Sequence, residues 1–207
     1  MVKRRIFTIL AIAAVCVAAP ASAASTNFYL AGSAGRSSID ADATSINNFA
    51  RSTVGPSATT VSTNDLGWKL QLGYQMTTSW ALEGGYTDLG KSKYINANPV
   101  YTADGAKKAN LFNLDLVGKM EITKPVSLLA RFGGYRWETK SDLPFAAGMS
   151  NVKDHGYNFK AGLGLQYDFN QNFALRAEFE RFNGVGKQET SGDSKVNLYS
   201  IGAVLMF

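Results

Sequence analysis

Five charged residues are the ones in this sequence whose types and positions could act together chemically: Glu83, Lys119, Arg131, Arg176 and Glu178. Each lies in a segment that otherwise places apolar side chains at every second position. A carboxylate or cation buried in such surroundings is stable only when it is paired and hydrogen-bonded. We therefore predict a structural ion-pair network, in which the two glutamates bridge Arg176 and Lys119. An alternative interpretation is a gate that occasionally opens a narrow pore.

The sequence offers little for catalysis. Its one histidine, His155, follows Asp154, and no nucleophile is placed beside the pair, which makes it weak evidence for an active site. The glycines of "AGLGLQ", Gly162 and Gly164, fall within an alternating segment and do not form a phosphate-binding loop. We predict no enzyme activity, no metal site and no cofactor.

The segments that must position these charges alternate with a period of two residues, which is typical of β-strands with two different faces. In "LGWKLQLGYQM", for example, Leu66, Trp68 and Leu70 lie on one face, and Gly67 and Lys69 lie on the other. Eight such segments follow one another along the chain, at residues 27–35, 66–76, 80–90, 110–121, 126–134, 156–169, 173–182 and 197–207.

The connections between these segments alternate in length. Three are tight, at Thr77–Ser79, Thr123–Pro125 and Asn170–Asn172. Four are long and polar, at roughly Arg36–Asn64, Lys91–Lys107, Thr139–Asp154 and Gly184–Lys195. Antiparallel neighbours place all tight turns at one end and all long loops at the other. The pattern predicts an all-β fold, an eight-stranded antiparallel up-and-down β-barrel.

The start of the chain has the composition of an export signal. Lys3, Arg4 and Arg5 precede an uncharged apolar run that ends at the small residues "ASA". We expect residues 1–23 to be a cleaved signal peptide and residues 24–207 to form one barrel domain. Cleavage of residues 1–23 removes these three basic residues, which lowers the formal net charge from +5 to +2. It also removes the only cysteine, Cys16. This composition does not indicate a nucleic-acid partner.

Alternation alone does not show which face points inward, and three features favour a membrane barrel with its apolar face outside. The bulky apolar side chains would crowd the interior of eight strands, which is just wide enough for its own side chains. No apolar face carries a charge in mid-strand, where a basic residue would cost about 2–4 kcal/mol in lipid. The aromatic residues form two girdles, as at membrane interfaces: Trp80, Tyr167, Phe169 and Phe173 near the tight turns, and Tyr86, Phe112 and Tyr157 toward the loops.

The quoted strands resemble the OmpA-like transmembrane barrel family, the OmpA/OmpX type of outer-membrane protein. "WKLQLGYQ", "WALEGGYTDLG", "LLARFGGYRW", "LRAEFERF" and "YSIGAVLMF" read like that family's strands, in order. The resemblance implies a Gram-negative outer membrane, periplasmic turns and extracellular loops. It also implies periplasmic chaperones and a barrel-assembly machinery that reads the final strand, here Tyr199, Ile201, Leu205 and Phe207. Many members continue into a peptidoglycan-binding domain, which we do not expect here.

Basic residues at or beyond the loop end are candidates for contact with lipopolysaccharide phosphates: Arg136, Arg181, Lys91, Lys93 and Lys140. We expect a monomeric, non-enzymatic outer-membrane barrel with a structural and surface-interaction role, whose lumen is filled by paired charges. A narrow pore for small solutes and a soluble periplasmic barrel with an apolar ligand are the alternatives.

Overall fold

The computed structural model describes residues 27–40, 58–62, 64–97, 102–142, 152–185 and 194–207. These residues form one antiparallel β-sheet. Among them no helix is long and apolar enough to cross a membrane. The strands are β1 (Phe28–Asp40), β2 (Ala58–Ser62), β3 (Asn64–Gln75), β4 (Trp80–Ala97), β5 (Thr102–Thr123), β6 (Val126–Asp142), β7 (Val152–Asp168), β8 (Phe173–Val185) and β9 (Ser194–Met206).

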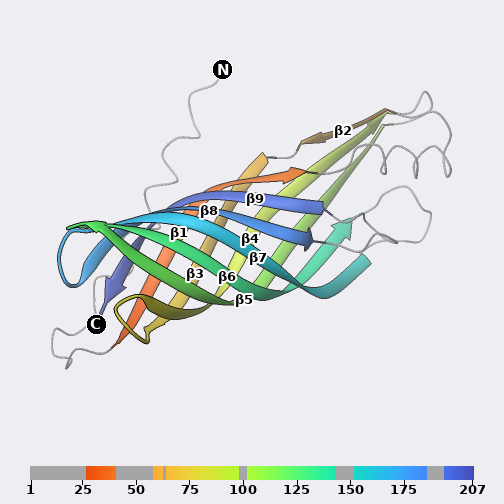
Figure 1. Ribbon diagram of the computed structural model, residues 1–207. Helices are drawn as coiled ribbons and strands as arrows, with labels where there is room; N and C mark the ends of the chain where they lie inside the picture. Colours follow the sequence, from red (N-terminus) through yellow and green to blue (C-terminus); the bar gives the residue numbers. More distant parts are fainter. Residues whose placement is uncertain (1–26, 41–57, 63, 98–101, 143–151, 186–193) are drawn as a thin grey trace, which may run out of the picture.

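The sheet closes into a barrel of eight strands, as predicted (Figure 1). Strand β1 pairs with β3 on one side and with β9 on the other, and each further strand pairs with its neighbour until β4 meets β5. The short strand β2 is not part of this wall. It pairs with the far part of β4, from Ala58 opposite Ala97 to Ser62 opposite Lys93. Because the eight-stranded wall closes on itself, its backbone hydrogen bonds are satisfied without an open edge.

Three tight connections fall where the sequence predicted them, and we call this the turn end of the barrel; the opposite end is the loop end. The turn before β8 shows the local cause. The Asn170 side chain accepts hydrogen bonds from the backbone N–H groups of Asn172 and Phe173, both at 2.9 Å. Thr77 does the same for Trp80 at 3.0 Å. Short polar side chains thus stabilise the chain reversals.

The strands are longer at the loop end than the sequence suggested. Strands β4 and β5 remain paired through stretches assigned to a loop, from Lys91 opposite Lys108 to Ala97 opposite Thr102. The boundaries given to the Lys91–Lys107 loop were therefore wrong, and strands β1, β6, β7, β8 and β9 extend a few residues into the other three predicted loops. The apolar alternation stops at these positions, but hydrogen-bonded pairing continues without it because the ladder uses backbone groups only.

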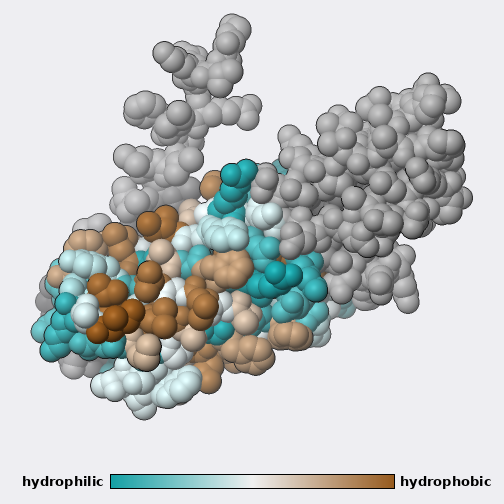
Figure 2. Space-filling model, turned by 45° about the horizontal axis from the view of Figure 1, so that its top comes forward, coloured by the Kyte–Doolittle hydropathy of each residue, from teal (hydrophilic) through white to brown (hydrophobic). Residues whose placement is uncertain are grey.

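Apolar side chains point outward, as predicted, and they form a brown band on the face of the barrel seen in Figure 2. Along β5 the alternation is regular. Phe112 and Leu114 are 65% and 58% exposed, whereas the intervening Leu111, Asn113 and Asp115 are buried. In water such a surface would be unstable, so the band fits a lipid environment.

The interior contains more aromatic rings than the sequence analysis allowed. Tyr29, Tyr135, Trp137 and Phe182 are all buried inside. Glycines on the neighbouring strands make room for inward rings. A Cβ atom on Gly156 would lie 2.6 Å from the Trp137 ring, so only glycine leaves space for this indole.

Candidate functional site: a charge network inside the barrel

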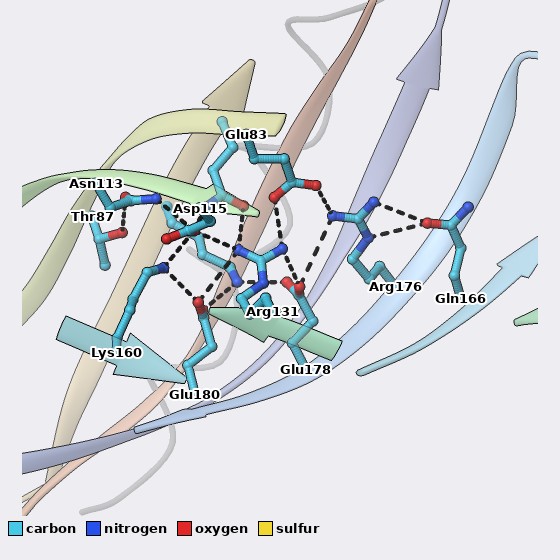
Figure 3. A network of polar contacts seen from close by, with 12 residues as sticks. Glu83, Thr87, Asn113, Asp115, Arg131, Lys160, Gln166, Arg176, Glu178 and Glu180 are labelled. Carbon is cyan, nitrogen blue, oxygen red and sulfur yellow. Dashed lines mark hydrogen bonds and ion pairs between the residues drawn. The ribbon is translucent and has the colours of Figure 1, made fainter. Parts of the chain in front are cut away.

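Arg131 on β6 is the centre of a network of buried charges (Figure 3). Its Nη2 atom lies 2.6 Å from Glu83 Oε2 and 2.6 Å from Glu178 Oε1. Its Nη1 atom lies 3.2 Å from Asp115 Oδ2 and 3.3 Å from Glu180 Oε1. One guanidinium therefore contacts four carboxylates, which come from β4, β5 and β8. Its planar fork of donors suits such an arrangement.

Two lysines complete the side of the network nearer the loop end. Lys160 Nζ lies between Asp115 Oδ2, at 2.8 Å, and Glu180 Oε1, at 2.7 Å. Lys69 Nζ contacts Glu178 Oε2 at 2.5 Å and also contacts Glu180. Lys160 and Glu180 are fully buried, so their ion pairs have no access to water.

Arg176 on β8 extends the network toward the turn end. Its Nη1 atom lies 2.6 Å from Glu83 Oε1. Its Nε and Nη2 atoms donate hydrogen bonds of 3.1 and 3.0 Å to Gln166 Oε1. The Tyr29 hydroxyl donates to Glu83 Oε1 at 2.7 Å, and the Arg176 guanidinium lies over the Tyr29 ring at 5.7 Å from its centre. Glu83 thus joins the two arginines, with a tyrosine as a third donor.

The network is electrically balanced. Its four acids and four bases are Glu83, Asp115, Glu178, Glu180 and Lys69, Arg131, Lys160, Arg176. Such charges are stable away from water because each has several partners. The set is a layer of mutually paired charges inside the barrel, an arrangement that a structural polar core requires.

Small residues on the inward face provide room for these long side chains. A Cβ atom on Gly162 would lie 2.9 Å from Glu180 Cγ and 3.2 Å from Arg131 Cγ. The space above Gly133 is occupied by the Asp115 carboxylate in the same way. The network therefore depends on glycines of β6 and β7, which leave space for its side chains.

Four of the five predicted network residues, Glu83, Arg131, Arg176 and Glu178, lie together in this cluster, but Lys119 does not. Its Nζ atom is 3.0 Å from Asp168 Oδ2, near the turn end, where both side chains are partly exposed. The bridge predicted between Lys119 and the two glutamates is wrong. Lys119 lies only a few residues before the β5–β6 turn, which places it in a different layer of the lumen.

Four further members were missed: Lys69, Asp115, Lys160 and Glu180. All of them belong to the polar face of the sequence alternation, which was a sufficient signal for their direction. The alternation does not show, however, at which position along the barrel axis each side chain lies. It therefore could not show that these four lie in the same layer as Arg131.

The basic rim residues whose side chains are described lie on β4, β6 and β8 toward the loop end. Arg136 on β6 and Arg181 on β8 are exposed on the outer surface, and Lys91 is exposed at the end of the β4–β5 register shift. Lys140 is also exposed and lies 3.9 Å from Glu138. The side chain of Lys93 falls outside the described residues.

The residues predicted as aromatic girdles lie on the outer surface, most of them well exposed, with Tyr86 and Phe173 partly covered. Near the turn end, Tyr167, Phe169 and Phe173 pack in a row, with ring centres 4.8 and 5.5 Å apart. Toward the loop end, Tyr86 contacts Phe112 at 5.2 Å. Of the predicted assembly residues, Tyr199 and Ile201 are exposed to the outside, and Phe207 is 38% exposed.

His155 is exposed near the loop end of β7, beside Asp154. Within the described ranges, no three His, Cys, Asp or Glu side chains are grouped so that they could hold a metal ion.

Comparison with known proteins agrees with this architecture. Residues 7–207 match the family described as outer membrane protein beta-barrel domain. Outer membrane protein A of Salmonella typhi is 32% identical over 149 residues, which is 70% of this chain and 41% of that protein. The counterpart of Yersinia pseudotuberculosis is 29% identical over 150 residues, 70% of this chain and 40% of that protein. The chain thus spans about two fifths of the length of these relatives.

Solved structures with a similar fold include Neisserial surface protein A, with a TM-score of 0.61, 15% identity, and coverage of 89% of this chain and 100% of that one. The outer membrane protein AlkL has a TM-score of 0.55, 12% identity, and coverage of 92% and 94%. At these identities the likeness concerns the fold alone.

Proposed function

This chain belongs to the outer membrane protein beta-barrel domain family and lies in the cell outer membrane, and from this premise we propose that it is a closed, non-enzymatic barrel. Its role is to present its extracellular loops from a rigid support. The observation that carries the proposal is the balanced charge network, which fills the lumen around Arg131. Ion pairs that satisfy one another have little tendency to separate and admit ions.

A soluble periplasmic barrel around an apolar ligand does not fit, because the large apolar side chains are on the outer surface. A narrow pore remains the second candidate, favoured by one feature. A cavity of about 30 Å³ opens at the turn end beside Tyr29, Lys119, Gln166 and Arg176. Such a volume holds only about two water molecules.

Planar-bilayer recording separates the closed barrel from the pore. Purified wild-type protein is expected to give no steady single-channel steps. Folding is checked in the same sample by heat-modifiable gel migration. Frequent, stable steps from folded wild-type protein would favour the pore and overturn the closed-barrel role.

We further propose that Arg136 and Arg181 bind anionic groups of lipopolysaccharide at the loop end. Both arginines are on the outer surface, near the ends of β6 and β8 that face the extracellular side. Arginine binds phosphate through paired charge-assisted hydrogen bonds. Lys91, Lys93 and Lys140 are further basic residues that we assign to the same lipopolysaccharide contact.

The double variant Arg136→Ala/Arg181→Ala is expected to bind purified lipopolysaccharide about tenfold more weakly, which corresponds to about 1.4 kcal/mol. The measurement is the shift of the thermal unfolding midpoint on adding lipopolysaccharide. Lys124→Ala, in the β5–β6 turn at the opposite end, is the matched control and should keep the wild-type shift. Equal shifts in all three proteins would rule out the rim site.

Strand β9 together with Phe207, which follows it, is proposed as the signal read by the assembly machinery. Phe207→Ala is expected to lower the yield of inserted barrel in cells, measured as the heat-modifiable fraction in outer membranes. Phe169→Ala, which removes an outward aromatic of the same girdle from a turn, is the control. If both variants inserted as well as wild type, Phe207 would have no signalling role.

A further inference from the structure

An apolar layer closes the barrel on the loop side of the charge network. We call it the septum. Its side chains are buried inside the barrel and come from β4, β5, β6, β8 and β9; they are Leu89, Ala109, Leu111, Tyr135, Trp137, Phe182, Val185, Val196 and Leu198. Phe182 and Leu198 are fully buried.

The other three strands complete the ring around the septum. Gly156 of β7 leaves the space for Trp137 described above, and a Cβ atom on Gly67 of β3 would lie 3.0 Å from Leu198 Cδ1. Ser37 of β1 donates a hydrogen bond of 2.6 Å to the Leu89 carbonyl oxygen. Every strand of the wall therefore contributes to the same layer.

The septum and the network are successive layers. Along β6, Arg131 is followed by Tyr135 and Trp137 toward the loop end; along β8, Glu180 is followed by Phe182. The two layers touch where Lys160 Nζ lies 5.2 Å from the centre of the Phe182 ring. Tyr135 packs edge-on against the same ring at 5.5 Å.

The turn-end side of the network is more open. Its apolar cluster contains three alanines, Ala31, Ala81 and Ala174, beside Tyr29, Val117, Leu129 and Val204, whereas the septum contains one alanine, Ala109. The cavity of about 30 Å³ lies at this level and reaches Arg176. The two sides of the network therefore differ in how closely water can approach it.

We infer that the septum is a second, independent closure of the lumen, which separates the charge network from the extracellular side and leaves it open to water from the periplasm only. The inference rests on the closed-barrel role proposed above and adds a layer to it. An apolar constriction excludes ions because it excludes the water that carries them. The septum therefore keeps the barrel closed even when the ion pairs are lost.

Four proteins and one volume control test this order in planar bilayers. The network variant, Arg131→Ser/Glu178→Ser, removes one charge of each sign and makes room for water. The septum variant, Trp137→Ala/Phe182→Ala, removes two rings of the apolar layer. The third protein combines all four substitutions, and the fourth is wild type. Trp137→Phe/Phe182→Leu, which keeps most of the volume, is the control, and heat-modifiable migration establishes that each protein is folded.

The combined variant is expected to give steady channel steps, whereas the network variant, the septum variant and the volume control stay closed. The inference is overturned if the network variant alone conducts as well as the combined one, because the septum then seals nothing. It is equally overturned if the folded combined variant never conducts. Steady steps from wild type would instead refute the closed-barrel role itself, so the two failures are distinguishable.

Discussion

Replacing Arg131 by methionine should lower the free energy of unfolding by about 3–5 kcal/mol, the largest effect we expect from one substitution inside the barrel. The guanidinium contacts Glu83, Glu178, Asp115 and Glu180. Methionine keeps much of the side-chain volume, so the loss comes from charge. It leaves four buried carboxylates with three cations, and an uncompensated buried charge is far more costly than an absent ion pair.

Two further variants show whether the cause is charge imbalance. Arg131→Met/Glu178→Gln restores the balance and should recover a large part of the loss, although both substitutions are buried. Arg136→Met, on the same strand but exposed, should change the stability by about 0–1 kcal/mol. Urea unfolding in lipid vesicles, followed by gel migration, measures all three. A double variant less stable than Arg131→Met would contradict the explanation.

Replacing Leu114 by arginine should destabilise the barrel by about 2–4 kcal/mol, because this side chain points outward from the middle of β5. Leu114 is 58% exposed, lies opposite Gly84 and Gly134 in the neighbouring strands, and has no carboxylate beside it in the register. An arginine there would face hydrocarbon. Its long side chain would have to reach toward the headgroups, which reduces the cost without removing it.

The control for this prediction is an arginine placed nearer the headgroups of the bilayer. Tyr157→Arg changes an equally outward residue, 77% exposed, near the loop end, where arginine should cost about 0–1 kcal/mol. The same urea unfolding in vesicles compares the two variants. Equal stability of Leu114→Arg and wild type would mean that the outer surface of β5 does not face lipid.

The wall of the barrel could be predicted because two local signals agreed. The period of two residues assigned a direction to each side chain, and short polar residues such as Thr77 and Asn170 indicated the turns. Register between distant strands is not encoded in either signal. For Lys119 the signal was present but not used. It was grouped with Arg131 by direction alone, although the tight turn between β5 and β6 fixes their register and places Lys119 opposite Leu129, nearer the turn end.

The septum was missed for a related reason. In the β6 segment, Leu129, Arg131, Tyr135 and Trp137 have the same parity, so their inward direction could be read from the sequence. Whether a ring fits inside depends on the neighbouring strand, which one segment alone does not show. The β6–β7 pairing places Gly156 opposite Trp137, and this glycine provides the space for the indole.

The central claim is that the apolar outer surface meets lipid while the septum lies inside the barrel, and the three tryptophans test it most directly. Trp68 and Trp80 are 45% and 49% exposed on the outside, whereas Trp137 is 3% exposed in the septum. Three single-tryptophan variants, with phenylalanine at the other two positions, are folded into vesicles of brominated lipid. Fluorescence of Trp68 and Trp80 should be strongly quenched and that of Trp137 protected. Quenching of Trp137 with protection of the other two would show that the inside and the outside have been exchanged.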